Sequence, residues 1–385
     1  MDLRVLKTNK YRRELKLPSS KAVLHRLFIK AFLGNKPETF KVNDLGEDLK
    51  ATLGFISSLN SKVIYRKAKI TIIPHKLYLK EELNAFNSAS TLRFFLPLLL
   101  HEFKSFHILC SEKLKERILK VGFPYENLVV TSTKTGLFFD GAKSEVLDNF
   151  PALTSQFFSG LLFLGYYLKR KFLLKSYDPY VLLTKEVLNS ATVNQEPCMS
   201  HLGLCLPLLI NSQVYVKGDF KELLQGDKEI LNFFLMVGGK IRVVGKKNFF
   251  VLDSPDDFVF DTTCNPDLFF PVLYFIHKYH KGRILITEKL RYKESNRIEA
   301  GINFFKALGS EFNTDNHFIT FKKTRENKEN NLETYGDHRL AILSLFLAPH
   351  IGKDYTIKNF DCAFKSSQNI LKYFRKIGGK YEEIN

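Results

Sequence analysis

The sequence predicts an α/β protein of two domains, each built from three repeated units of a helix followed by a strand. The main observation is a pattern that recurs in the second half of the chain, at residues 232–238, 303–309 and 372–378. Each segment is typical of the last turns of an amphipathic helix, and each ends in a glycine that can adopt the left-handed C-cap conformation. A strand-like run follows the first of them, at residues 240–244.

The first half carries weaker versions of this pattern at residues 53–64, 118–130 and 184–193. The resulting period of roughly 60 to 70 residues is typical of a repeated supersecondary unit whose apolar helix face is buried only when the units assemble. The chain has 385 residues, whereas one hydrophobic core usually holds no more than about 250 to 300 residues. Two domains of three units each are therefore expected.

The composition indicates an anionic partner without identifying it. Lys and Arg number 58 against 40 Asp and Glu, which gives a net charge of +18. Phosphorylated metabolites and nucleic acid are both compatible with that charge. Part of the excess can come from a nucleotide-biased genome, because Phe, Lys, Ile and Asn are abundant and Trp is absent.

Cysteine usage and hydropathy indicate a cytosolic protein. The five cysteines are odd in number and have no Cys-x-x-Cys or Cys/His spacing that would hold zinc, so buried free thiols are expected. The N-terminus is charged and has no apolar signal core. The longest apolar stretch, residues 157–168, is well short of the roughly 20 residues that span a bilayer. We expect a cytoplasmic protein that does not enter the membrane.

Residues 289–300 form the most informative segment. Arg291, Lys293, Glu294 and Arg297 lie within seven positions, and Asp337-His338-Arg339 follows about forty residues later. Several cations around one carboxylate predict an anion-binding pocket in which the Glu can exchange protons. On spacing alone, a solvated helix face with i,i+4 ion pairs explains the segment equally well.

Nine short motifs, spread over the whole chain in a fixed order, strengthen the first interpretation. Together they resemble the enolpyruvyl transferases, and most closely the branch that acts on shikimate 3-phosphate. The motifs are Pro-Ser-Ser-Lys at 18–21 with Arg26, Asn-Ser-Ala-Ser-Thr-Leu-Arg at 87–93, Ser-Glu-Lys-Leu-Lys at 111–115, Thr-Ser-Gln at 154–156, Asp-Pro-Tyr at 178–180, Pro-Asp at 266–267, Lys-Glu-Ser-Asn-Arg at 293–297, Asp-His-Arg at 337–339 and Lys-Ser at 365–366.

The resemblance implies an inside-out α/β barrel in each domain, with helices inside and sheets outside. It also implies that residues 1–19 and 197–385 form one discontinuous domain, which carries the groups for the phosphoenolpyruvate carboxylate and for proton transfer. Residues 20–196 would form the second domain, which carries most contacts to shikimate 3-phosphate. The active site would lie in the cleft between the two domains.

The reaction that the resemblance implies transfers the enolpyruvyl group of phosphoenolpyruvate to the 5-hydroxyl of shikimate 3-phosphate and releases phosphate, within aromatic amino acid biosynthesis. It proceeds by addition and elimination and needs neither a metal nor a cofactor. The pocket must neutralise two phosphates and two carboxylates and exclude water. The implied protein is a monomer whose partners are these two substrates, without specific nucleic acid.

Roles follow from the matched motifs, residue by residue. Asp267 would accept the proton of the 5-hydroxyl, Glu294 would serve carbon 3 of the enol, and Lys21 could protonate the departing phosphate. A helix N-cap is the competing interpretation of Asp267. Phosphoenolpyruvate contacts are implied for Lys21, Ala89, Lys113, Gln156, Arg297, Arg339 and Lys365. Contacts to shikimate 3-phosphate are implied for Lys21, Ala22, Arg26, Thr154, Ser155, Gln156, Tyr180, Asp267 and Lys293.

Several positions depart from the family pattern. Ala22 and Tyr177 stand where the family has hydroxyl residues, Lys113 replaces Arg, Asn296 replaces Asp, Lys289 stands where a neutral residue is common in some members, and the segment around Cys198 differs strongly. Each lost neutral hydrogen bond would weaken substrate binding by about 1 kcal/mol. Ala89 replaces a glycine in the turn that approaches phosphoenolpyruvate, so we expect reduced sensitivity to glyphosate, the family's inhibitor.

Three alternatives stay open at this stage. The chain could be the related transferase that acts on a UDP-sugar, although that enzyme lacks this combination of motifs. It could be a non-catalytic or substrate-shifted relative of the same fold, as the departures suggest. It could also bind nucleic acid, although only the net charge suggests this function.

Overall fold

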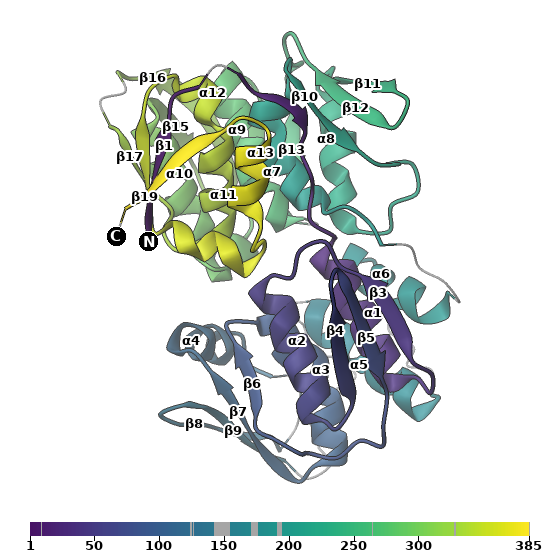
Figure 1. Cartoon of the computed structure of the whole chain (residues 1–385). Helices are drawn as coiled ribbons and strands as arrows, with labels where there is room; N and C mark the ends of the chain where they lie inside the picture. The colour runs from purple at the N-terminus through teal and green to yellow at the C-terminus, as the bar shows by residue number, and fades with distance from the viewer. Residues whose placement is uncertain are drawn as a thin grey trace. The chain divides into compact units, whose positions relative to one another are not determined.

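The computed structural model describes residues 1–8, 10–123, 125, 127–141, 155–170, 176–190, 195–263, 265–326 and 329–384. The chain divides into two compact units, unit 1 of Met1–Pro18 and Pro197–Asn385 and unit 2 of Ser19–Glu196. Helices and strands alternate along both units (Figure 1), so the predicted mixed α/β fold class is confirmed.

Unit 1 holds three four-stranded sheets. Their strands are β1 (Asp2–Leu6), β2 (Arg12–Glu14), β10 (Gln213–Lys217), β11 (Lys240–Val244), β12 (Lys247–Val251), β13 (Val259–Asp261), β14 (Arg283–Leu285), β15 (Ser310–Thr314), β16 (Phe318–Thr324), β17 (Asn331–Glu333), β18 (Tyr355–Lys358) and β19 (Lys380–Ile384). The helices are α7 (Met199–Leu209), α8 (Glu229–Met236), α9 (Phe269–Tyr279), α10 (Arg297–Ala307), α11 (His338–Phe346), α12 (Ala348–Ile351) and α13 (Ile370–Lys376). The described residues of unit 1 also form the 3-10 turns η1 (Gly226–Lys228), η2 (Pro266–Leu268), η3 (Glu288–Tyr292) and η4 (Phe360–Lys365).

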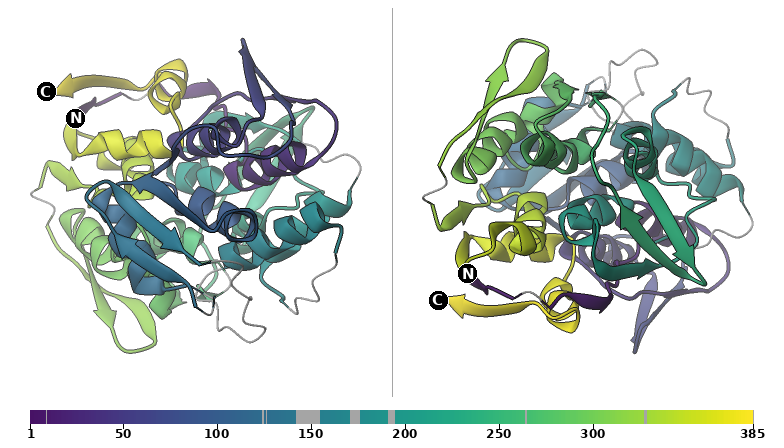
Figure 2. Two further views of the ribbon diagram at one scale, coloured as in Figure 1. Left: turned by 90° about the horizontal axis from the view of Figure 1, so that it is seen from below. Right: turned by 90° about the horizontal axis from the view of Figure 1, so that it is seen from above.

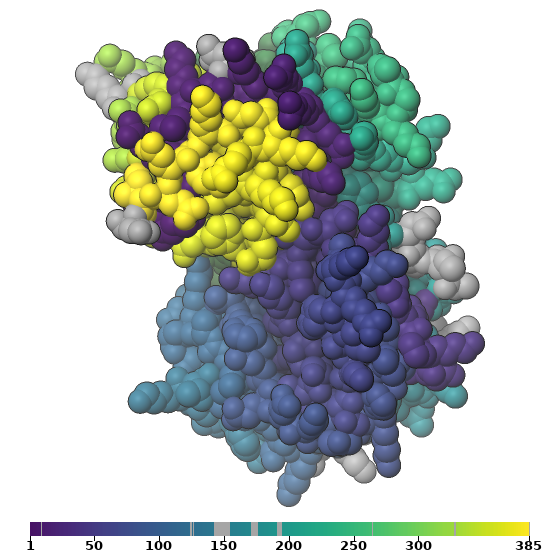
Figure 3. Space-filling model, viewed as in Figure 1, coloured from purple at the N-terminus to yellow at the C-terminus, as the bar shows by residue number. Residues whose placement is uncertain are grey.

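The three sheets of unit 1 share one topology. Their strand orders are β17-β18-β1-β19, β2-β10-β12-β11 and β13-β14-β16-β15. In each, the first two strands pair in parallel and the remaining neighbours pair antiparallel. Because β1 lies between β18 and β19, the two ends of the chain meet in one sheet, as both views of Figure 2 show. In Figure 3 the N-terminal and C-terminal segments accordingly lie side by side on the surface.

The core of unit 1 is helical. Helices α7, α9 and α11 contact one another, and every residue of α7 and α11 is buried. The predicted glycine caps are confirmed, since Gly238, Gly309 and Gly378 have φ of 85°, 92° and 104°, and a strand follows each of them within two residues. At Gly378 a side chain would also collide with the carbonyl of Lys10.

Unit 2 holds two sheets among its described residues. Its strands are β3 (Glu38–Lys41), β4 (Lys62–Arg66), β5 (Lys69–Ile73), β6 (Leu83–Phe86), β7 (Ser105–Cys110), β8 (Val129–Ser132) and β9 (Gly136–Asp140). Its helices are α1 (Lys21–Leu33), α2 (Glu47–Ser58), α3 (Ala89–Glu102), α4 (Glu112–Val121), α5 (Ser155–Leu168) and α6 (Pro179–Asn189). The order β6-β7-β9-β8 repeats the topology of unit 1, whereas β3-β5-β4 is antiparallel throughout.

In the part of the chain that the structure describes, an order of helix, strand, helix and two strands occurs four times. A fifth repeat runs from α11 to β19 and takes its second strand, β1, from the start of the chain. The predicted helix-then-strand segments at 53–64 and 118–130 correspond to α2 with β4 and α4 with β8. The predicted segment 184–193 begins in α6, but residues 191–194 lie outside the described residues.

Two further sequence predictions have mixed outcomes. The composition of residues 322–333, rich in Lys, Glu and Asn, predicts a loop. The first three of these residues belong to β16 and the last three to β17, so that prediction is wrong at both ends. Four cysteines are free thiols, of which Cys198 and Cys205 are buried, while Cys264 lies outside the described residues. Among the described residues, no helix is long and apolar enough to cross a membrane.

Candidate active site

Arg297 is the centre of a buried charged cluster in unit 1. It opens helix α10, and its side chain is 1% exposed. Nη1 donates to Asp267 Oδ1 at 2.7 Å and to the Pro266 carbonyl at 3.0 Å. Nη2 donates to Glu294 Oε2 at 3.1 Å, and Nε donates to Asp337 Oδ2 at 3.1 Å. The guanidinium is thus held in one orientation by three carboxylates and a backbone carbonyl.

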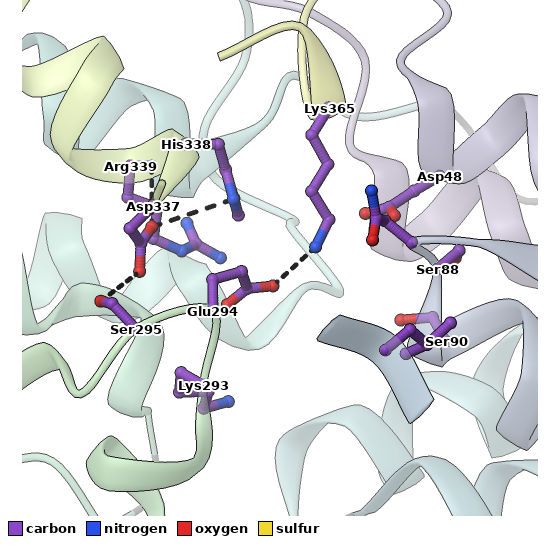
Figure 4. Close-up of polar contacts among 12 residues, drawn as sticks. Asp48, Ser88, Ser90, Lys293, Glu294, Ser295, Asp337, His338, Arg339 and Lys365 are labelled. Atoms are coloured by element: carbon purple, nitrogen blue, oxygen red, sulfur yellow. Dashed lines mark hydrogen bonds and ion pairs between the residues drawn. The ribbon is translucent and has the colours of Figure 1, made fainter. Parts of the chain in front are cut away.

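Asp337 explains how two helices are brought to this position. It is the N-cap of α11, and its Oδ1 accepts a hydrogen bond from the backbone N–H of Arg339 at 2.9 Å. Its Oδ2 accepts from Arg297 Nε and also from Ser295 Oγ at 3.2 Å (Figure 4). One fully buried carboxylate therefore caps α11 and orients the first residue of α10.

Asp267 lies against three cations. Its Oδ2 is 2.7 Å from Arg339 Nη2, and its Oδ1 is 2.7 Å from Arg297 Nη1 and 3.5 Å from Lys293 Nζ. Burial disfavours the charged form of this carboxyl, but the charges of Arg339, Lys293 and Arg297 outweigh burial and hold its pKa well below the usual range. The alternative role as a helix cap is wrong, because Asn265 caps the turn η2 by accepting from the backbone N–H of Asp267.

Glu294 bridges two cations from different segments. Its Oε2 accepts from Arg297, and its Oε1 accepts from Lys365 Nζ at 3.0 Å (Figure 4).

Burial lowers the pKa of Lys293, although Asp267 and Glu294 oppose that shift. For Arg297, burial also favours the neutral form, but Asp337, Asp267 and Glu294 raise its pKa above the ordinary value.

The six sequence-predicted residues of unit 1 thus meet in one cluster, which we call the arginine cluster. Its predicted members are Asp267, Lys293, Glu294, Arg297, Arg339 and Lys365, and Asp337 completes it. Four cations face three carboxylates, so an added anion would find a net positive site with two guanidinium groups. The helix-face interpretation holds only for Arg291, which is exposed and pairs with Glu288.

In unit 2, Lys21 opens helix α1 and forms an ion pair with Asp48, at 2.8 Å between Nζ and Oδ2. A chain of hydroxyl groups lies beside this pair. Thr52 Oγ1 is 2.7 Å from His25 Nδ1 and 2.8 Å from Thr91 Oγ1. These contacts tie helices α1, α2 and α3 together next to Lys21. Desolvation lowers the pKa of His25 to about 3, so its ring is neutral in the fold.

Arg26 lies one turn after Ala22 in α1 and is 2% exposed. Its donors reach Thr184 Oγ1 at 2.7 Å, the carbonyls of Ala22 and Tyr180 at 2.7 and 2.9 Å, and Ser159 Oγ at 3.4 Å. Burial lowers its pKa to about 10. Among the described residues no carboxylate forms an ion pair with it, so this buried charge lacks the partner that such charges usually have.

Gln156, near the start of α5, is held by two residues of helix α3. Its Oε1 accepts from Arg93 Nη1 at 2.8 Å, and its Nε2 donates to Ser90 Oγ at 2.8 Å. Ser155 opens the same helix and is half-buried. Ala89, the first residue of α3, is 4% exposed.

Two predicted residues of unit 2 are not brought to these contacts. Lys113 is exposed on α4 and has no hydrogen bond or ion pair to another described residue, and Thr154 lies outside the described residues. The sequence analysis in turn missed two polar residues of the site. Arg93 belonged to a quoted motif and could have been chosen for its charge. Asp48 had no local signal, because its pairing with Lys21 depends on the packing of α1 against α2.

Comparison with known proteins identifies similar sequences and similar folds. The family model for EPSP synthase (3-phosphoshikimate 1-carboxyvinyltransferase) matches residues 204–373. A 3-phosphoshikimate 1-carboxyvinyltransferase of Brachyspira hyodysenteriae is 26% identical over 94% of this chain and 95% of its own length. The enzyme of that name from Clostridium acetobutylicum is also 26% identical, over 96% of each chain.

Two solved structures share the fold. The EPSP synthase of Acinetobacter baumannii superposes with a TM-score of 0.69 at 16% identity, over 99% of this chain and all of the other. The enolpyruvyl transferase NikO from Streptomyces tendae superposes with a TM-score of 0.71 at 10% identity, over 99% and 98% of the two chains. The fold is therefore that of the enolpyruvyl transferases.

Within that class the resemblance is more specific. The matched family model and both of these relatives of nearly full length carry the name 3-phosphoshikimate 1-carboxyvinyltransferase. The chain is thus similar to EPSP synthases, and the resemblance that the motifs indicated is confirmed.

Proposed function

We propose that the protein is an enzyme that transfers the enolpyruvyl group of phosphoenolpyruvate to the 5-hydroxyl of shikimate 3-phosphate and releases phosphate. The observation that carries this proposal is the arginine cluster, in which Arg297 and Arg339 both contact the carboxylate of Asp267. Two guanidinium groups that already hold one carboxylate provide the geometry that a substrate carboxylate needs. The names of the relatives support the same reaction.

We also propose that units 1 and 2 are the two domains of an inside-out barrel with six repeated units, three in each domain. Closure of the two domains would place the arginine cluster opposite Lys21, Arg26 and Gln156, with the active site in between. The enzyme would act as a cytoplasmic monomer.

Phosphoenolpyruvate would bind through its carboxylate to Arg297 and Arg339. Both arginines already donate to Asp267, so the substrate competes with an internal carboxylate for the same donors. Lys365 and, from unit 2, Lys21, Lys113 and Gln156 would hold the phosphate that leaves. Most of the positive charge is thus in place before the substrate arrives, which limits the reorganisation needed during the reaction.

Competition between the substrate carboxylate and Asp267 for Arg297 and Arg339 would allow Asp267 to act as a general base. The charges of Arg339, Lys293 and Arg297 hold its pKa well below the usual range, which makes the resting carboxylate a weak proton acceptor. A substrate carboxylate on Arg297 and Arg339 would bring one negative charge that partly offsets these two cations, and it would raise the pKa of Asp267. The base would therefore become effective only once phosphoenolpyruvate is bound, and it would then accept the proton of the 5-hydroxyl.

Glu294 would deliver a proton to carbon 3 during addition and remove one during elimination. Its two carboxylate oxygens contact Lys365 and Arg297, so one of these contacts must open when Glu294 takes up a proton. Lys21 would protonate the departing phosphate. Its ion pair with Asp48 fixes the ammonium near the start of helix α1.

Shikimate 3-phosphate would bind mainly to unit 2. Arg26 and Tyr180 would face the carboxylate and the ring, and the buried charge of Arg26 would gain the anion that it lacks among the described residues. The 3-phosphate would be held by Thr154, Ser155, Gln156 and, from unit 1, Lys293. Ala22 lines the same place with a methyl group where a hydroxyl would have added a hydrogen bond.

A phosphate-release assay with both substrates tests the proposal. Wild type should release phosphate only when shikimate 3-phosphate and phosphoenolpyruvate are both present. Glu294→Gln and Lys21→Met should each reduce turnover by about 100-fold or more, the usual contribution of a proton-transfer group. Glu299→Gln and Lys50→Met change the same charges at exposed positions of helices α10 and α2 and should leave turnover unchanged.

The same assay separates the alternatives. Release with a UDP-sugar in place of shikimate 3-phosphate would assign the chain to the related transferase. No release with either acceptor, from a protein that still binds phosphoenolpyruvate, would favour a non-catalytic relative.

A further inference from the structure

The outer face of the β3-β5-β4 sheet in unit 2 carries a basic cavity that the proposed reaction does not use. The cavity has a volume of about 580 Å³ and is lined by Lys41, Arg66, Lys67, Ala68 and Lys69. Sites for small molecules usually have volumes of about 300 to 1,000 Å³. Four of its five lining residues carry a positive charge, and none carries a negative one. All five are exposed.

The strand register places three of these cations in one row. Lys69 of β5 lies directly opposite Lys41 of β3 and directly opposite Arg66 of β4. Adjacent strands are only about 4.8 Å apart, and like charges that face each other across strands destabilise a sheet. The row points away from the core, because Phe40 and Ile70, the next residues along β3 and β5, are buried on the opposite face.

The turn between β4 and β5 adds the fourth cation. Lys67 has φ of 54°, a left-handed conformation that is costly for a residue with a side chain. The turn is fixed to the neighbouring strand, because the carbonyl of Ala68 accepts a hydrogen bond from the N–H of Val42 at 2.8 Å. The four charges are therefore presented by a hydrogen-bonded sheet.

The four cations have no acidic partner within the described part of the chain, where none of their side chains takes part in an ion pair or a side-chain hydrogen bond. Other lysines at the surface of the protein do have such partners, for example Lys217 with Glu14 and Lys323 with Glu311. The four cations of the cavity thus repel one another and have no ion-pair partner among the described residues. An anionic ligand would stabilise this arrangement.

We propose that this cavity binds a small molecule with two or more linked phosphate groups. Three charges in a row across three strands span about 10 Å, so one carboxylate or one phosphate could meet only part of the row. The lining has no aromatic ring on which a base could stack, so the phosphate chain is the recognised element. The hydroxyl groups of Thr39 and Thr71 lie two residues away on the same face and form a hydrogen bond of 2.8 Å with each other, which leaves one hydroxyl proton to donate to the ligand.

Titration of the full chain with inorganic tripolyphosphate, followed by calorimetry, tests the proposal. We expect one site per chain in wild type. The double variant Lys67→Gln/Lys69→Gln should bind tripolyphosphate at least about tenfold more weakly than wild type, because charge-assisted contacts are lost. The matched control Lys240→Gln/Lys246→Gln removes two charges from the exposed β11–β12 hairpin and should bind like wild type. Lys67→Arg/Lys69→Arg keeps the charge and should retain the site.

Four results would overturn the proposal. Equal weakening in the cavity variant and the hairpin control would mean that the ligand responds only to net charge. Displacement by phosphoenolpyruvate would place the ligand in the arginine cluster. Displacement by single-stranded nucleic acid, with an affinity that rises with length, would indicate a nucleic-acid surface. Loss of binding in the Lys67→Arg/Lys69→Arg variant would show that positive charge at these positions does not form the site.

Discussion

Replacing Arg297 by Lys tests whether the guanidinium, and not only its charge, holds the arginine cluster. Arg297 makes four hydrogen bonds of 2.7 to 3.1 Å with Asp267, Pro266, Glu294 and Asp337. An ammonium group is a single point and cannot reach Asp337 on one side and Glu294 on the other. We expect two charge-assisted bonds to be lost, at about 1.5 to 3 kcal/mol each.

A second estimate gives a similar magnitude. Asp337 is fully buried, and its Oδ2 would lose its charged partner and keep only the hydrogen bond from Ser295 Oγ. Removal of one member of a buried ion pair typically costs about 3 to 5 kcal/mol. The free energy of unfolding of unit 1 should therefore fall by about 3 to 5 kcal/mol. In the phosphate-release assay, the value of kcat/KM for phosphoenolpyruvate should fall at least 100-fold, because the fork that orients its carboxylate is gone.

Urea denaturation and the phosphate-release assay should be run beside the control Arg291→Lys. This arginine lies six residues earlier, has a side chain that is 42% exposed and pairs with Glu288. The control should cost less than about 0.5 kcal/mol and leave turnover unchanged. If Arg297→Lys destabilises the protein no more than Arg291→Lys does, the four contacts do not hold the cluster and the reasoning fails.

Three further predictions concern unit 2. The pKa of His25 is lowered to about 3, below its value in the unfolded chain, so the stability that depends on the neutral ring is complete above about pH 6.5 and decreases as the pH falls toward 3. At pH 4.5 the loss should reach about 3 kcal/mol in urea denaturation, and a His25→Gln variant should show a flatter pH dependence. Thr52→Val removes the buried hydrogen bonds of this hydroxyl with His25 and Thr91 and should lower the free energy of unfolding by about 1 to 3 kcal/mol. Thr39→Val, at an exposed hydroxyl pair, should lower it by less than about 0.5 kcal/mol, and equal losses in the two variants would contradict this prediction. Ala89→Gly should increase inhibition by glyphosate in the phosphate-release assay, and unchanged inhibition would refute the steric role of the methyl group.

Local features of the sequence predicted the repeated elements well. Gly238, Gly309 and Gly378 indicated helix ends because a left-handed cap is a property of a few consecutive residues. The run 322–333 was misread for a related reason. Its Lys, Glu and Asn residues indicate that their side chains are exposed to water, but they do not indicate the backbone conformation. Residues of β16 and β17 have exposed side chains while their backbone pairs in sheets.

The candidate site depended on information that spacing does not contain. Nothing near Arg297 in the sequence indicates that Asp267 and Asp337, thirty and forty residues away, accept its hydrogen bonds. Family motifs supplied that grouping. The row formed by Lys41, Arg66 and Lys69 had no motif, and its existence depends on a strand register that only the assembled sheet defines.

The position of β1 between β18 and β19 has a consequence for biosynthesis. Residues 19–196 form a contiguous unit that can fold as soon as it leaves the ribosome, because domains generally fold as units during synthesis. The opening strand of the other unit must wait, since both of its neighbours come from the last thirty-one residues, 355–385. Until β18 and β19 have been synthesised, β1 exposes two unpaired edges, and we expect this nascent intermediate to depend on chaperones or on rapid synthesis of these strands.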